Sequence, residues 1–189
     1  MLDTVTHIAR AFQVFETRPM IHIPYHFGNH WICIRVDFEY GMAWVLYSMD
    51  KDPVTYKDFL SILRTAYRFY RRDLKGKPNK RGTDDLYIKT RFPCHKQRPG
   101  SGHYGYYVCE FIRVNGQYRR HPERWPKNLF ADDVSMDDDH LLEIVNDLCK
   151  FILDEIIHKL GRYHDPSSQI ARQANCRLLR EWESLNLGR

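Results

Sequence analysis

The sequence predicts a mixed α+β fold, because strand-like segments gather early in the chain and helix-like segments dominate its later part. Three runs rich in β-branched and aromatic residues lie between residues 20 and 48, separated by turn-forming residues. Apolar residues recur at helical intervals over residues 55–72 and again over 135–160. Together these patterns favour a sheet with helices packed against it.

The first half of the chain is expected to hold most of the sheet. Residues 3–15 place apolar side chains at helical spacing and predict a short amphipathic helix. Strands are expected over residues 20–24, 30–37 and 42–48, with turns at 25–29 and 39–41.

The second half is expected to be mainly helical. A helix over about 55–72 is followed by a strand within 86–92 and a central helix over 104–114. Residues 118–133 are polar and irregular in pattern. Ser135 and the three aspartates after it predict the cap of a long helix that ends near Gly161.

We expect two parts in the chain, a domain over residues 1–165 and an amphipathic C-terminal helix within 166–189. This helix is expected to pack on its own domain or to bind a partner, including a second copy in an oligomer. No apolar run is long enough to span a membrane, and the amino terminus lacks a secretion pattern. A soluble protein of the nucleus or cytoplasm is therefore predicted.

The composition predicts neither a disulfide framework nor a metal site. The five cysteines are an odd number and form no Cys-x-x-Cys pair. No cofactor-binding motif is present, so no cofactor is expected. The net charge of +5 is concentrated in residues 71–81, which are interpreted as a solvated loop or, alternatively, as an import signal or polyanion-binding loop. No nucleic-acid-binding motif accompanies this segment, so a nucleic-acid ligand is not expected.

A glycine-bearing turn followed by an apolar helical run is the most informative motif. The pair His30-Trp31, then Gln97, then the run Gly105-Tyr106-Tyr107-Val108-Cys109-Glu110-Phe111 occur in this order. In this combination, over about residues 15–165, the chain resembles the catalytic domain of the ubiquitin-like-protein (SUMO or sentrin) cysteine proteases, most of all the branch carried by plant transposons. The resemblance implies a papain-like fold with a central, mostly antiparallel sheet flanked by helices.

Two departures from this family remove its chemistry. Tyr47 stands where the family has the aspartate that orients the histidine, and Tyr104 stands where it has the nucleophilic cysteine. Such proteases need a thiolate, a histidine that keeps it ionised and a carboxylate that orients the imidazole. A tyrosine hydroxyl has a reference pKa of about 10 and is a poor substitute for a thiol. Of the catalytic set only His30 and the oxyanion-stabilising Gln97 remain, as relics.

Another cysteine is a weak replacement for the nucleophile. Cys109 lies five residues beyond Tyr104, which on a helix displaces it by about 7.5 Å and rotates it by roughly 140°. Asp50 is three residues beyond Tyr47, an odd offset that places it on the other face of a strand. Takeover of the catalytic roles by Cys109 and Asp50 is therefore not favoured.

The resemblance implies a catalytically inactive protease homologue that works by binding another protein, as a regulator, inhibitor or decoy. In the family, the tryptophan that follows the histidine covers the channel for the Gly-Gly tail of a ubiquitin-like protein. Trp31 and Gly105 are interpreted as residues kept for that binding. Two alternatives stay open, namely that Trp31 is a core residue and that Tyr104 blocks the channel. The alternative function is an active cysteine peptidase that processes a ubiquitin-like protein with Cys109 or Cys94 as nucleophile.

Overall fold

The computed structural model describes residues 2–49, 52–113 and 135–169. Contacts between Cα atoms divide the chain into two compact units, Met1–Met136 and Asp137–Arg189, and each is described by itself. The boundary expected after residue 165 falls inside the second unit and stays a prediction. The expected C-terminal helix lies mostly outside the described residues. None of the described helices is long and apolar enough to cross a membrane.

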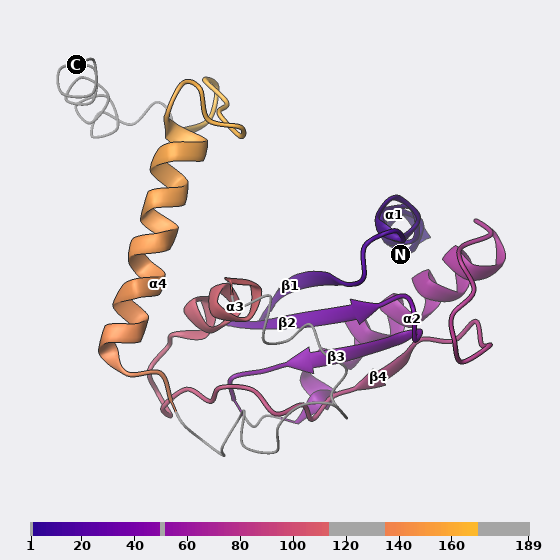
Figure 1. Cartoon of the computed structure of the whole chain (residues 1–189). Coiled ribbons are helices and arrows are strands. Elements are labelled where there is room, and N and C mark those ends of the chain that lie inside the picture. The colour runs from indigo at the N-terminus through magenta and orange to yellow at the C-terminus, as the bar shows by residue number, and fades with distance from the viewer. Residues whose placement is uncertain (1, 50–51, 114–134, 170–189) are drawn as a thin grey trace. The chain divides into compact units, whose positions relative to one another are not determined.

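The first unit is built on a mixed sheet of four strands. These are β1 (Ile21–Phe27), β2 (His30–Asp37), β3 (Met42–Leu46) and β4 (Tyr87–Lys89), in the spatial order β1-β2-β3-β4 (Figure 1). The first three strands are antiparallel neighbours, and β4 runs parallel to β3. The predicted α+β class is confirmed.

The hairpin between β1 and β2 is longer than the sequence predicted. We expected β1 to end at residue 24, but it continues to Phe27, which pairs with His30 across the turn. The two turn residues, Gly28 and Asn29, have φ of 44° and 63°. Positive φ at both positions is what a type I′ hairpin turn requires, and Gly and Asn are the residues that adopt it at least cost. The compact turn leaves residues 25–27 free to continue the strand.

One face of the sheet is covered by α1 (Leu2–Phe15) and α2 (Lys57–Arg72). The 3₁₀ turn η1 (Pro53–Tyr56) precedes α2 and is capped by Asp52, whose carboxylate accepts a hydrogen bond from the Val54 N–H at 2.9 Å. Alternate residues of β2 and β3 meet the helices in one hydrophobic core, because strand side chains alternate between faces. Its strand members include Ile32, Ile34, Val36, Ala43 and Val45.

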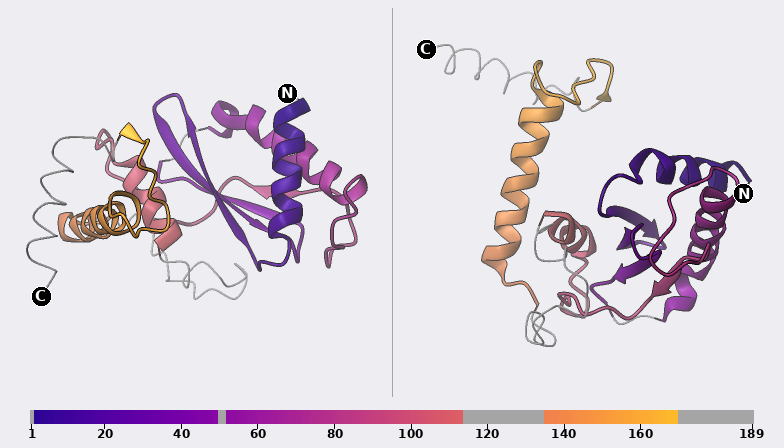
Figure 2. Two further views of the ribbon diagram at one scale, coloured as in Figure 1. Left: turned by 90° about the horizontal axis from the view of Figure 1, so that it is seen from above. Right: turned by 45° about the vertical axis from the view of Figure 1, so that its right-hand side comes forward.

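The opposite face carries α3 (Tyr104–Arg113), the central helix predicted over residues 104–114. Figure 2 shows α2 and α3 on different sides of the sheet. The buried face of α3 includes Tyr107 and Phe111. The Tyr107 hydroxyl donates to the carbonyl of Lys96 at 3.0 Å and accepts from the Met136 N–H at 3.1 Å. The helix is thereby fixed to the segments on either side of it.

Three residues paired across β1, β2 and β3 place a buried charge on this face of the sheet, away from the turn between β1 and β2. His22 of β1 pairs in register with Arg35 of β2, which in turn pairs with Trp44 of β3. Arg35 is 1% exposed, its guanidinium carbon lies 5.2 Å from the Trp44 ring centroid, and its side-chain nitrogens have no hydrogen-bond partner among the described residues. Burial lowers the pKa of Arg35 to about 10. Burial, and then the charge of Arg35, lower the pKa of His22 to about 4.

The basic segment 71–81 is tied to acidic side chains. Arg71 and Arg72 both pair with Asp84, at 3.3 and 3.2 Å. Lys80 pairs with Glu39. These ion pairs reduce the positive charge that the segment presents to a polyanion.

The second unit, as far as residue 169, contains α4 (Asp138–Phe151) continued by a π-helical turn, η4 (Ile152–Ile157). The sequence suggested Ser135 as the cap, but the N-cap is Asp137, whose side chain accepts from the His140 N–H at 2.8 Å. After η4 the chain folds back on the helix end, where the Tyr163 N–H donates to the Glu155 carbonyl at 2.9 Å.

Candidate functional site

Three of the predicted site residues form one aromatic cluster in the first unit. His30 is the first residue of β2, Tyr47 follows the end of β3, and Tyr104 is the first residue of α3. The His30 ring lies 4.5 Å from the Tyr104 ring, with the planes at 76°. It lies 6.4 Å from the Tyr47 ring, with the planes at 73°. Two strands and a helix distant in sequence therefore converge on His30.

Tyr47 is a packing residue in this cluster. It is 4% exposed, and its ring contacts those of Phe27 and Tyr56 with centroids 6.1 and 6.0 Å away. Its hydroxyl is buried and has no hydrogen-bond partner among the described residues. Burial, and then the neighbouring Tyr104, raise the pKa of Tyr47 above its ordinary value. A neutral phenol cannot supply the negative charge with which a carboxylate stabilises an imidazolium.

Gln97 is held beside the cluster by Ser48, the residue that follows Tyr47. The Gln97 backbone N–H donates to the Ser48 carbonyl at 2.8 Å, and the Ser48 hydroxyl donates to Gln97 Oε1 at 2.7 Å. Gln97 Nε2 donates to the hydroxyl of Ser101 at 3.3 Å, in the glycine turn before α3. The amide is therefore oriented with its N–H side toward that turn.

Sequence reasoning did not assign a role to Ser48. Its two hydrogen bonds fix both the backbone and the side chain of Gln97, although the two residues are far apart in the chain. The one signal in the sequence was its position, because Ser48 directly follows Tyr47.

The turn before α3 leaves the start of that helix open. Gly100 and Gly102 have φ of 79° and 67°, a region that favours glycine. The N–H groups of Tyr106 and Tyr107 donate to the His103 carbonyl at 3.0 and 3.3 Å. The N–H groups of the two preceding residues donate to no described backbone carbonyl. Free N–H groups and the helix dipole make such a terminus attractive to an anionic group.

Trp31 and Gly105 lie where the described fold leaves space around them. The Trp31 ring contacts that of His26, its partner on β1, with centroids 4.8 Å apart. Trp31 is 39% exposed, although it lies between the partly buried His30 and the fully buried Ile32. The interpretation of Trp31 as a core residue is therefore not supported. Gly105 has no positive φ, and a Cβ built on it would meet nothing within 4 Å. Open space and an exposed indole thus lie at the two residues that the sequence assigned to binding.

No described cysteine occupies the position of a nucleophile beside His30. Cys33 and Cys94 are buried, and the Cys94 thiol donates to the Tyr47 carbonyl at 3.3 Å. Cys109 is half-buried on α3, and burial raises its pKa. Asp50, the other takeover candidate, lies outside the described residues.

The candidate site contains a cluster of aromatic rings, the buried amide of Gln97 and the N-terminus of α3. No thiolate is found among its described residues. Among the described residues, no group of three or more histidine, cysteine or acidic side chains is placed to hold a metal ion. Comparison with known proteins finds no matching family model and no matching curated protein.

Proposed function

We propose that this protein is a pseudoprotease, a catalytically inactive relative of the ubiquitin-like-protein proteases that acts by binding another protein. The observation that carries the proposal is the packing of Tyr104 on His30 at the start of α3, 4.5 Å between ring centroids, where a protease of this kind has its thiol. The α+β fold, with α3 on one sheet face, is compatible with the papain-like architecture that we propose for it.

The loss of two catalytic groups argues against turnover. Tyr104 replaces the nucleophile and the neutral, buried Tyr47 replaces the carboxylate. Removal of a nucleophile alone abolishes nearly all protease activity in well-studied systems. What remains is a positioned amide on Gln97 and the free N–H groups at the helix terminus, which recognise negative charge without performing chemistry.

The partner we propose is a ubiquitin-like protein, bound through its extended carboxy-terminal tail. Trp31 supplies an exposed aromatic surface on the strand that begins at His30, and Gly105 leaves room for a backbone to approach the start of α3. The terminal carboxylate of a mature tail would meet the positive end of the helix dipole. Binding a mature tail would make the protein a decoy or an inhibitor that competes with working proteases.

The proposal is tested by measuring both binding and cleavage with a panel of ubiquitin-type and SUMO-type modifiers. We expect saturable binding of at least one mature modifier and no hydrolysis of its precursor. Trp31→Ala should weaken binding about tenfold, the usual effect of removing an aromatic anchor, while Tyr87→Ala serves as a control. Tyr87 is 49% exposed on β4, away from the cluster.

Two results would overturn the proposal. Cleavage of a precursor at an enzyme-like rate would show that catalysis had been rebuilt. A modifier with a carboxy-terminal electrophile, followed by mass spectrometry, would then locate an adduct on Cys109 or Cys94 and support the peptidase alternative. Absence of binding to every modifier in the panel would exclude the proposed partner class.

A further inference from the structure

A groove of about 430 Å³ lies between α1 and β1, in a part of the first unit that the candidate site does not use. Ile8, Ala11 and Phe15 line it from α1, and residues 21–24 line it from β1. Phe15 is 46% exposed, although it is a large aromatic residue. Apolar side chains exposed along a groove are typical of a surface to which another chain binds.

The groove runs along the free edge of β1. Strand side chains alternate between two faces, so Ile21 and Ile23 lie on the face that packs on the core, and His22 and Pro24 lie on the other. A groove lined by both pairs must reach the edge of the strand, since neither face alone contains all four residues. β1 is the outermost strand of the described sheet, so this edge pairs with no described strand (Figure 1).

The hairpin with β2 decides which backbone groups of β1 point to the free edge. In a two-residue hairpin the residues that flank the turn, here Phe27 and His30, exchange two hydrogen bonds, as does every second pair after them. His22, Pro24 and His26 belong to the other pairs and direct their backbone groups outward. Pro24 fits this position because it has no N–H to donate to β2. The edge therefore presents two N–H groups and three carbonyls to an added strand.

The end of the groove near the start of β1 carries positive charge. Arg18 lies in the turn between α1 and β1, and its backbone N–H donates to the carbonyl of Phe15 at 2.9 Å. The Arg18 side chain is exposed and forms no hydrogen bond or ion pair with any described residue. Glu16, the acidic residue of this turn, already accepts a hydrogen bond from the Tyr70 hydroxyl at 2.8 Å. Charge complementarity therefore favours an acidic residue of a partner at this end.

We propose that the edge of β1 binds an extended segment of another protein as an added antiparallel strand. Its alternate apolar side chains would enter the groove, and an acidic residue at its carboxy-terminal end would lie near Arg18. Backbone hydrogen bonds supply affinity in this mode of recognition, and the groove selects the side chains. The inference concerns a different surface from the one proposed for a modifier tail and does not depend on the proposed function.

The test titrates the peptide acetyl-Thr-Val-Thr-Val-Thr-Val-Asp-amide into the whole protein by calorimetry. Directly opposed residues of two strands share a face, so the peptide residues that bond to His22 and His26 lie on the face away from the groove. In this peptide those residues are the threonines. N-methylation of the threonine amides should therefore weaken binding at least tenfold, whereas N-methylation of the valine amides should leave it unchanged. Replacing the peptide's aspartate with asparagine should weaken binding about two- to fivefold.

Three variants of the protein assign the contacts. Phe15→Ala should weaken peptide binding about tenfold, because an aromatic wall of the groove is lost. Val14→Ala is the matched control, since Val14 is the adjacent residue of α1, is 70% exposed and does not line the groove. Arg18→Gln should abolish the difference between the aspartate and asparagine peptides. All three side chains are exposed, so folding should be maintained, and thermal unfolding verifies this.

Several results would overturn the proposal. No saturable binding of the peptide at millimolar concentration would exclude the site. Equal effects of the two methylations would exclude an added strand, and equal effects of Phe15→Ala and Val14→Ala would exclude the groove. Dimerisation of the free protein that Phe15→Ala abolishes, measured by sedimentation, would assign this surface to a second copy of the chain instead.

Discussion

The rings of His30 and Tyr104 lie nearly perpendicular, at 76°, with their centroids 4.5 Å apart. This contact joins the first residue of β2 to the first residue of α3, so the start of the helix is placed over the histidine. A smaller side chain at residue 104 would sit at the same helix terminus. The position still has two features that lower a thiol pKa, namely a histidine nearby and a helix N-terminus.

Tyr104→Cys is therefore expected to create a reactive thiol. Its pKa should fall below the reference value of about 8.5, and iodoacetamide should alkylate it faster than any native cysteine of the described structure. Adding Tyr47→Asp should increase the alkylation rate further, because a carboxylate would then stabilise the imidazolium. Rates measured against pH give the thiol pKa in each variant.

Cys109 supplies the internal comparison for that experiment. Burial raises its pKa, so it should react slowly in the wild-type protein and in both variants. If the thiol introduced at residue 104 reacted no faster than Cys109, the proposed relation between His30 and the helix terminus would be incorrect.

Gly105→Ala should weaken binding of a modifier tail without lowering the free energy of unfolding. A methyl group at residue 105 meets nothing within 4 Å, and alanine favours helix, so stability should stay unchanged or rise by up to about 1 kcal/mol. Binding of a modifier tail should nevertheless weaken, because the methyl group occupies the open space. Denaturant unfolding and a binding titration measure the two effects.

Gly41→Ala is the contrasting control for Gly105→Ala. Gly41 has φ of 60°, and a Cβ there would overlap the side-chain amide of Asn79. That amide donates to the hydroxyl of Tyr67 at 3.1 Å. A loss of about 1–3 kcal/mol in unfolding free energy is expected. Equal effects of the two substitutions would show that Gly105 is constrained by the fold.

Acidification should destabilise the protein through His22. Burial and Arg35 lower the folded-state pKa of His22 from 6.5 to about 4, so the unfolded chain binds the proton first as pH falls. The contribution of His22 is fully present above pH 6.5 and is lost between 6.5 and about 4, by at most about 1.4 kcal/mol per pH unit. His22→Gln should flatten this part of the urea-unfolding profile measured as a function of pH.

Arg35→Met should maintain stability or raise it by up to about 2 kcal/mol. The substitution removes a buried charge whose nitrogens lack hydrogen-bond partners in the described structure, which outweighs a contact with Trp44 worth roughly 1–2 kcal/mol. The pKa of His22 should also rise, because Arg35 is one cause of its depression. Denaturant unfolding and NMR titration of the His22 ring provide the two measurements.

Arg35→Lys is the matched comparison for Arg35→Met. It retains the charge in a more strongly hydrated form and is expected to be less stable than the wild type. Marked destabilisation by Arg35→Met would show that the guanidinium has a partner that the described residues do not contain.

Local sequence patterns were sufficient to predict most elements of the fold but not their ends. The strand over residues 30–37 and the helix that starts at Tyr104 lie where they were predicted. The end of β1 was predicted too early, because Pro24 indicated a break. In the structure Pro24 lies in β1, which pairs on only one side within the described sheet and so tolerates the missing N–H. Pairing with β2, a long-range interaction, decided the length of the strand.

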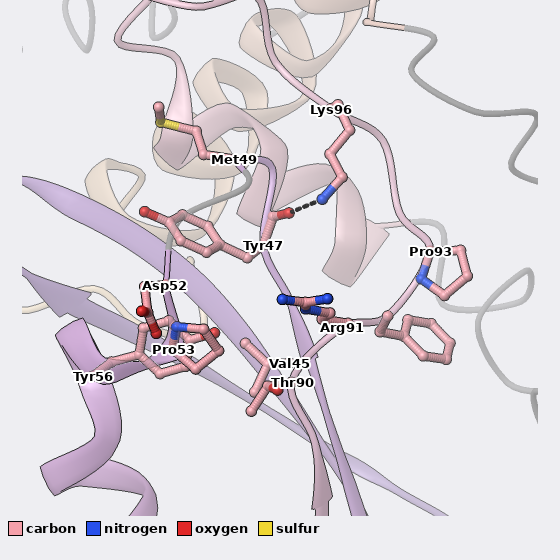
Figure 3. A pocket seen from close by; sticks show the side chains of 11 residues that line it. Val45, Tyr47, Met49, Asp52, Pro53, Tyr56, Thr90, Arg91, Pro93 and Lys96 are labelled. Atoms are coloured by element: carbon pink, nitrogen blue, oxygen red, sulfur yellow. Dashed lines mark hydrogen bonds between the residues drawn. The ribbon is translucent and has the colours of Figure 1, made fainter.

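The sequence indicated which residues belong to the candidate site, but not how buried or exposed each of them is. The family resemblance carried by His30, Gln97 and Gly105 indicated the residues, while the burial of Tyr47 and the exposure of Trp31 depend on segments far away in the chain. A cavity of about 700 Å³ beside Tyr47, drawn in Figure 3, was not anticipated at all. Its lining combines residues near the end of β3, such as Tyr47, with residues of the segment after β4, such as Lys96, and no pattern within either segment indicates that the two approach each other.

The two-residue turn at Gly28 and Asn29 has a consequence for the chemistry of the adjacent strand. Because side chains alternate across a sheet, the turn length decides which of His30 and Trp31 faces Tyr47. Deleting or inserting one turn residue would exchange the two faces, so the indole would point at the phenols and the imidazole would point away. A turn that contains no reactive group thus decides which side chain of β2 lies in the candidate site.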